Sequence, residues 1–226
     1  MIRVHHLNNS RSQRVLWLLE ELGQPYEVVR YARDPKTMLA PQALRDVHPL
    51  GKSPVLEIDG RRLVESGAII EALVERFDAD HALSPAPGDE DEDERLRYRQ
   101  WLHYAEGSAM PPLLLSLVFN RLRSAPMPFF ARPIARGIAD KAMQTFIGPQ
   151  LETHLQYIEH ELGAYQWFAS DRFTAADIQM SFPLEAAVAR AGDRAGPNIR
   201  RFVERIHARP AYRRALEAGG PFELGR

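Results

Sequence analysis

Two short segments of this chain carry residue types that could bind a small charged peptide. The first spans residues 48–56, reads HPLGKSPVL, and has Pro54 directly before a predicted hydrophobic strand. The second spans residues 64–70, reads VESGAII, and has Glu65 and Ser66 at the start of a predicted helix. Because proline has no backbone N–H, Pro54 belongs at the first residue or on the edge of a strand, and the bond before it is a candidate for the cis form.

These residues are complementary to a zwitterion. A helix N-terminus has unpaired N–H groups and a partial positive charge, which favour a ligand carboxylate. Ser66 adds a hydroxyl donor, and Glu65 can accept from an ammonium group. The backbone of Val55 is expected to pair with an extended ligand, and Lys52 supplies a mobile charge for a second carboxylate. The predicted binding residues are Lys52, Ser53, Pro54, Val55, Glu65 and Ser66.

Each of these features also has a purely structural interpretation. A Glu-Ser pair at the start of a helix is, by itself, more often a helix cap than a ligand site. A single lysine on a loop is usually solvated. The combination of these features with the Pro54-Val55 strand entry favours a binding site for a ligand with an amino-acid head, an extended backbone and a distal carboxylate.

Several segments resemble the glutathione transferase family. The resemblance covers nearly the whole chain and is carried by residues 9–23, 48–56, 64–70 and 173–178. Residues 106–108, 111–113 and 176–184 are similar to the fungal glutathione transferase 1 type and its bacterial relatives. The resemblance implies an α/β thioredoxin-like N-terminal domain followed by an all-helical C-terminal domain, and a homodimer. It implies glutathione as co-substrate, which has the charge pattern derived above, and small apolar electrophiles as partners.

Conjugation requires an ionised glutathione thiol, because the thiolate is the nucleophile and a free thiol titrates at about pH 8.5. A hydrogen-bond donor at a helix N-terminus would lower that pKa. Ser10 aligns with the serine of the family's serine-type members, four residues before Arg14, and Asn9 is the second candidate because its amide also donates. Ser12 fits the start of the helix better. The alternative is that Asn8, Asn9 and Ser10 only form a turn.

The resemblance also places an apolar pocket for the electrophile between the domains. Gly107, Met110 and Pro111 are the expected walls of this pocket. Methionine is adaptable and suits varied apolar ligands. The alternative for Met110 is a place in the core.

Hydrophobic periodicity and turn signals predict the domain organisation. Within residues 1–80, strands are expected at 2–6 and 26–30, and residues 55–58 and 62–64 should form a hairpin. Helices are expected at residues 12–22, within residues 37–46, and in a third segment that ends near Phe77. Residues 81–92 are the predicted linker, and residues 93–226 show helical spacing without a convincing strand. The sequence therefore predicts a glutathione-binding domain, a linker and an all-helical domain that carries the electrophile pocket.

Three details are expected within the helical part. Pro111 and Pro112 should bend or interrupt a helix. A long helical stretch should run roughly from residue 131 to 162. Thr174 and Asp177 have the spacing of a reciprocal helix cap, which concerns folding and not chemistry.

Composition excludes several other classes of function. The formal net charge of −1 removes the electrostatic case for nucleic-acid binding. The chain has no cysteine, which excludes disulfides, thiolate metal sites and a mechanism that uses a protein thiol. No tyrosine lies next to the turn at residues 8–12, which disfavours a tyrosine mechanism, and the histidines lack metal-ligand spacing, so no metal is expected. No segment resembles a signal peptide or a membrane span, so we expect a soluble cytoplasmic protein.

Two hypotheses of different classes remain. The first is a transferase that joins the glutathione thiolate to apolar electrophiles, with reduction of organic hydroperoxides by glutathione as a variant. The second is a non-enzymatic binding protein that uses the same surfaces to recognise partners. The retention of Lys52, Pro54, Glu65 and Ser66 together favours the enzyme, because a protein-binding relic has no need of an intact peptide site.

Overall fold

The computed structural model describes residues 1–86, 88 and 92–224. In this described part, a single four-stranded sheet has the order β2-β1-β3-β4. Its strands are β1 (Ile2–Leu7), β2 (Tyr26–Tyr31), β3 (Val55–Ile58) and β4 (Arg61–Val64). β1 and β2 are parallel, with Ile2 opposite Tyr26, and β3 is antiparallel to both β1 and β4. The predicted strands and the 55–64 hairpin are therefore confirmed.

Three helices accompany the sheet: α1 (Ser12–Glu21), α2 (Gln42–Val47) and α3 (Ser66–Phe77). α1 connects the parallel strands β1 and β2, as a parallel pair requires a crossover. Residues 12–19 of α1 are all buried, because the helix packs against β1 and α3 as well as against two helices of the second half, α8 (Ala175–Arg190) and α10 (Pro210–Gly219). α1 therefore lies at the centre of the molecule, and not only on the sheet.

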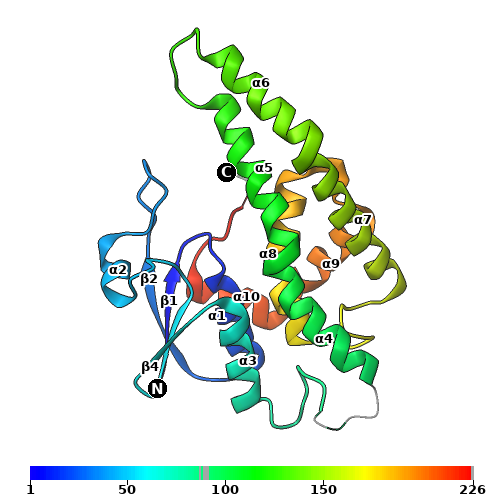
Figure 1. Ribbon diagram of the computed structural model, residues 1–226. Coiled ribbons are helices and arrows are strands. Elements are labelled where there is room, and N and C mark those ends of the chain that lie inside the picture. Colours follow the sequence, from blue (N-terminus) through cyan, green and yellow to red (C-terminus); the bar gives the residue numbers. More distant parts are fainter. Residues whose placement is uncertain (87, 89–91, 225–226) are drawn as a thin grey trace.

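The second half of the described chain is helical. Its remaining elements are α4 (Glu92–Tyr104), η1 (Ala105–Ala109), α5 (Met110–Ser124), α6 (Arg132–Ala142), η2 (Met143–Ile147), α7 (Gly148–Ala164), η3 (Gly192–Arg194) and α9 (Pro197–His207). Figure 1 shows α1 and α3 between the strands of the sheet and the helices of the second half, with α5 and α6 projecting as a hairpin. The fold is a thioredoxin-like domain joined to a helical domain. No helix among the described residues is long and apolar enough to cross a membrane.

Two of the long helices contain a wider turn than predicted. η1 and η2 are π-helical turns, and each directly precedes a helix that has proline in its first residues. Proline is tolerated there, because the first N–H groups of a helix have no partner within it. The predicted interruption near Pro111 therefore takes the form of a π turn over residues 105–109. The predicted helical stretch from 131 to 162 is confirmed as α6, η2 and α7, which follow one another without a gap.

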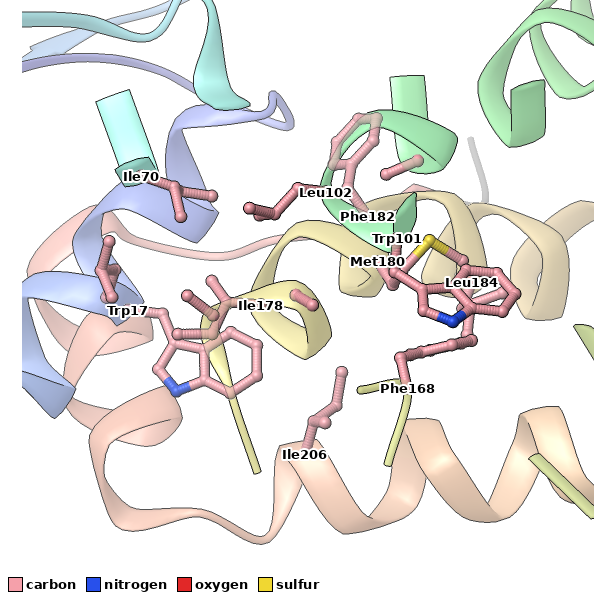
Figure 2. Close-up of a cluster of buried hydrophobic side chains, with 14 of the residues drawn as sticks. Trp17, Ile70, Trp101, Leu102, Phe168, Ile178, Met180, Phe182, Leu184 and Ile206 are labelled. Atoms are coloured by element: carbon pink, nitrogen blue, oxygen red, sulfur yellow. The ribbon is translucent and has the colours of Figure 1, made fainter. Parts of the chain in front are cut away.

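One hydrophobic core joins the two halves. Figure 2 shows Trp17 and Ile70 from the first half close to side chains from the second, among them Ile178 of α8. Every residue of α8 from Ala175 to Ala187 is buried. Because interiors are densely packed, a helix buried on all sides holds the two domains in one fixed arrangement.

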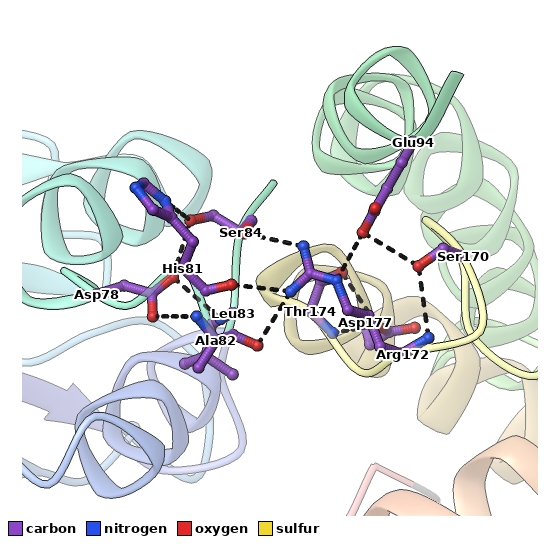
Figure 3. A network of polar contacts seen from close by, with 10 residues as sticks. All are labelled: Asp78, His81, Ala82, Leu83, Ser84, Glu94, Ser170, Arg172, Thr174 and Asp177. Carbon is purple, nitrogen blue, oxygen red and sulfur yellow. Dashed lines mark hydrogen bonds and ion pairs between the residues drawn. The ribbon is translucent and has the colours of Figure 1, made fainter. Parts of the chain in front are cut away.

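The start of α8 is also tied to the chain that leads out of α3. Thr174 and Asp177 form the predicted reciprocal cap, which is therefore confirmed. Arg172 donates to the carbonyls of His81 and Ser84, and Figure 3 shows how these contacts join the two segments. The predicted linker 81–92 lies partly outside the described residues, and its boundaries stay a prediction.

Candidate functional site

The loop before β3 is held against β1 by one hydroxyl. Ser53 Oγ donates to the carbonyl of His5 at 2.8 Å and accepts from the N–H of Leu7 at 3.1 Å. The peptide bond between Ser53 and Pro54 is cis. Lys52 is exposed, and no ion pair or hydrogen bond to its side chain is recorded within the described part of the chain. Its charge is available to a ligand.

The expected role of Val55 is wrong. Val55 is completely buried and has a strand partner on each side, His5 of β1 and Val64 of β4. β3 is an interior strand, so the Val55 backbone does not present an open edge to an extended ligand. Pro54, directly before the strand, has no N–H, and the next backbone outside the ladder is that of Ser53, which is half-buried.

Glu65 has an unusual backbone and an unused carboxylate. Its φ is +69°, a left-handed value that costs a residue with a side chain about 1–3 kcal/mol. It precedes α3, but its side chain makes no capping hydrogen bond. Within the described residues the exposed Glu65 carboxylate has no recorded hydrogen bond or ion pair. The simple capping interpretation therefore fails for Glu65, and its carboxylate is available to an ammonium group.

Ser66 is oriented by an arginine that the sequence analysis did not select for the site. Its hydroxyl oxygen accepts from Arg14 Nη2 at 2.9 Å and, more weakly, from Gln179 Nε2 at 3.5 Å. Ser66 is 3% exposed and Arg14 is 1% exposed. Because the Ser66 oxygen accepts from these donors, its own hydrogen is left for another acceptor. A carboxylate at the N-terminus of α3 would be such an acceptor.

Arg14 joins α1 to three other segments. Besides Ser66 of α3, it donates to the carbonyl of Gln179 in α8 and to Glu106 in η1, each at 2.5 Å. The other Glu106 oxygen accepts from Arg11 Nε at 2.8 Å. Burial favours a higher pKa for Glu106, but the charges and hydrogen bonds of Arg14 and Arg11 outweigh it and lower that pKa. The carboxylate is therefore ionised and neutralises a buried guanidinium.

The turn between β1 and α1 contains both candidate donors to sulfur. Asn9 has a φ of +51°, and its side-chain oxygen accepts from the N–H of Glu223 at 2.8 Å. A backbone N–H can bind only the oxygen, so the Asn9 NH₂ group points elsewhere. Ser10 is 4% exposed, and its hydroxyl lies 3.5 Å from Ser53 Oγ. The structure thus brings the turn and the loop before β3 together.

The expected walls of the second pocket lie around the end of η1. Gly107 and Pro111 are exposed, whereas Met110 is 6% exposed and belongs to the core. The core alternative for Met110 is therefore the one that the structure supports. Among the described residues, no group of three or more His, Cys, Asp or Glu side chains could hold a metal ion.

Arg14, Glu106 and Gln179 were missed as parts of this site. Arg14 is a charged residue within the apolar run of α1. Because charged residues are almost never fully buried unless they are paired, this position could have indicated an ion pair. Glu106 and Gln179 gave no such signal, because their partner is 92 and 165 residues away along the chain.

Comparison with known proteins identifies the family and supports the fold. The sequence model of the glutathione S-transferase N-terminal domain matches residues 10–76, and that of the C-terminal domain matches residues 128–210. Glutathione S-transferase 3 of Schizosaccharomyces pombe is 38% identical over 218 residues, which cover 96% of this chain and 87% of that protein. Glutathione S-transferase 1 of Saccharomyces cerevisiae is 34% identical over 226 residues, which cover 96% of this chain and 94% of that protein. A solved glutathione S-transferase from Actinobacillus pleuropneumoniae has a TM-score of 0.80 at 31% identity, covering 100% of this chain and 96% of that chain.

Proposed function

The chain belongs to the glutathione S-transferase family and is a glutathione transferase, and from that premise we propose how its residues bind and activate glutathione. The observation that carries the proposal is the unused Glu65 carboxylate beside the Ser66 hydroxyl at the start of α3. Glu65 accepts from the α-ammonium group of glutathione. Ser66 and the N–H groups of α3 bind its α-carboxylate. Lys52 binds the distal carboxylate as an exposed point charge.

The middle of glutathione lies along the loop before β3. Pro54 has no N–H and Val55 is an interior strand residue, so we assign the backbone contact to Ser53. In this arrangement the thiol points toward the turn between β1 and α1. Ser10 is the first candidate donor to the sulfur and Asn9 is the second.

The reaction is a nucleophilic displacement or addition. The donor and the N-terminus of α1 stabilise the thiolate, and the thiol proton leaves to solvent. The sulfur then attacks an electrophilic carbon. With an aryl halide, a C–S bond forms and halide departs. Gly107 and Pro111 border the space for the apolar electrophile.

The experiment separates binding from turnover. Calorimetry with glutathione should show that Glu65→Ala and Ser66→Ala each weaken binding by about 1.5–3 kcal/mol, the range for hydrogen bonds to charged groups. Glu75→Ala, an exposed carboxylate on the same helix, is the matched control and should not change the affinity. Unchanged affinity of both Glu65→Ala and Ser66→Ala, with the fold intact, would overturn the binding site.

Turnover with an aryl halide and with cumene hydroperoxide then defines the activity. Conjugation is the expected result, and reduction of the hydroperoxide would add the peroxidase activity. Glutathione binding without turnover of either compound would favour the alternative, a binding protein. We also propose a homodimer, on the ground of family membership.

A further inference from the structure

A buried chain of hydrogen bonds leads from His6 of β1 to Ser10. His6 Nδ1 lies 2.9 Å from Ser12 Oγ, and Ser12 Oγ lies 2.8 Å from Ser10 Oγ. The exposed fractions of His6, Ser12 and Ser10 are 3%, 0% and 4%. These hydrogen bonds therefore connect His6 to Ser10, the first candidate donor to the sulfur.

The direction of this chain decides what Ser10 can do. Each hydroxyl has one hydrogen to donate. If Ser12 donates to His6, then Ser10 donates to Ser12, and only the lone pairs of Ser10 remain for the sulfur. If His6 donates to Ser12, then the Ser12 hydrogen goes to Ser10 at 2.8 Å, a nearer acceptor than the Leu7 carbonyl at 3.5 Å, and the Ser10 hydrogen is left for another acceptor. Only the second direction stabilises a thiolate.

The surroundings of His6 favour the second direction. Burial, with a smaller contribution from the charge of Arg30, lowers the pKa of His6 to about 4, so the ring is neutral and has one N–H. Within the described part of the chain, Nδ1 has Ser12 as a partner and Nε2 has no recorded hydrogen bond. An N–H on Nδ1 is paired with Ser12, whereas an N–H on Nε2 would have no acceptor among the described residues.

The neighbours of Ser10 support the same direction. The backbone N–H of Ser12 also donates to Ser10 Oγ, at 3.3 Å. Ser53 Oγ already donates to the carbonyl of His5, so the Ser53 hydrogen is not directed at Ser10. In the second direction the Ser10 oxygen accepts from Ser12 twice, and its hydrogen is free to serve a stronger acceptor than the Ser53 oxygen at 3.5 Å.

We propose that His6 is a positioning residue: as the Nδ1–H tautomer it directs the Ser12 hydroxyl toward Ser10 and thereby turns the Ser10 hydrogen to the glutathione sulfur. This inference rests on the proposed function, with Ser10 as the donor. It assigns a part in thiol activation to a buried side chain that does not touch glutathione.

The test measures the thiol pKa of bound glutathione by ultraviolet titration of the thiolate, together with the Kd for glutathione. His6→Phe keeps a ring but has no donor, and we expect the thiol pKa to rise by about one unit, which leaves about tenfold less thiolate below the pKa. The Kd measured at a pH below the bound thiol pKa should not change, because glutathione then binds with its thiol protonated. His6→Asn places an amide N–H near the position of Nδ1 and should restore the thiol pKa. His5→Phe, on the neighbouring residue whose Nδ1 pairs with Tyr31, is the control and should match the wild type.

A double variant and a second break in the chain complete the design. His6→Phe with Ser10→Ala should have the thiol pKa of Ser10→Ala alone, because both act through one hydroxyl. If His6→Phe does not fold, Ser12→Ala interrupts the same chain and should give the same rise. A wild-type thiol pKa in either variant, or additive shifts in the double variant, would overturn the proposal.

The outcomes also separate this inference from the proposed function. If Ser10→Ala leaves the thiol pKa unchanged while glutathione binds and is turned over, the role of His6 is refuted and the function stands. If the wild-type protein does not bind glutathione, the proposed function itself fails.

Discussion

Glu106 offers the most direct test of how the helical domain supports the glutathione site. Its carboxylate accepts from Arg14 at 2.5 Å and from Arg11 at 2.8 Å. The Arg14 side chain is 1% exposed, whereas that of Arg11 is 36% exposed. Glu106→Ala therefore removes one partner of a buried charge and one partner of a solvated charge.

The expected loss follows from this difference in exposure. A hydrogen bond between charged groups in a buried position is worth about 1.5–3 kcal/mol. A solvated pair such as that of Arg11 contributes about 0–1 kcal/mol. We expect Glu106→Ala to lower the free energy of unfolding by about 1.5–4 kcal/mol and Arg11→Ala to lower it by less than about 1 kcal/mol.

The pH dependence gives the prediction a second, independent readout. The pKa of Glu106 in the folded protein lies below its ordinary value of 4.5, because Arg14 and Arg11 outweigh the effect of burial. Stability from a carboxylate with a lowered pKa is present above the unfolded value and is lost as the pH falls through the folded one. The difference between wild type and Glu106→Ala should therefore be full at neutral pH and shrink below pH 4.5.

Urea denaturation at several pH values measures both quantities. The control is Arg11→Ala, which removes only the solvated partner of Glu106. A loss for Arg11→Ala as large as that for Glu106→Ala would refute the reasoning. So would a stability difference between wild type and Glu106→Ala that grows on acidification.

Four further predictions test other contacts. Lys52→Ala should weaken glutathione binding by about 0–1 kcal/mol, less than Glu65→Ala, and a larger loss in calorimetry would mean that the main anchor is wrong. Burial lowers the pKa of His6 from 6.5 to about 4, so the free energy of unfolding should fall by up to about 3 kcal/mol as the pH falls from 6.5 to 4. In urea denaturation, His6→Asn should show a shallower pH dependence of this free energy than the wild type. Equal slopes would contradict a neutral buried His6. Glu223→Pro removes the backbone N–H that donates to the Asn9 side-chain oxygen. This variant should alter the thiol pKa of bound glutathione only if Asn9 donates to the sulfur. Glu217→Ala is the control and should leave the thiol pKa unchanged. Light scattering should give about twice the 25.7 kDa chain mass, and a monomer that turns over substrate would refute the dimer.

Local patterns predicted most of the thioredoxin-like half. The hairpin of β3 and β4 could be read because a hydrophobic run on each side flanks Asp59-Gly60, a strong turn signal. The Thr174 and Asp177 cap could be read because its partners are only three residues apart. The resemblance to fungal glutathione transferases is likewise confirmed by the relatives from two yeasts.

The errors concern contacts between distant segments. The Val55 backbone was expected to pair with a ligand, because the sequence predicts the hairpin of β3 and β4 but not that β1 lies along the other side of β3. The π turns at η1 and η2 were missed because proline marks a change in a helix without specifying its form. In the sequence, Arg14 served only to locate Ser10 four residues before it. The structure shows that three acceptors of Arg14 belong to other elements.

The position of Arg14 changes the meaning of the division into two domains. Glu65, Ser66 and Lys52 belong to the thioredoxin-like half, but the guanidinium that orients Ser66 is held by Glu106 and Gln179 of the helical half. Without the helical half, Arg14 would lose its counter-charge and a carbonyl acceptor, and the Ser66 hydroxyl would no longer be held in one orientation. Glu106 in turn depends on η1, since it belongs to the π turn between α4 and α5. In the proposed binding mode, the helical domain therefore takes part in binding the amino-acid end of glutathione, in addition to bordering the space for the electrophile.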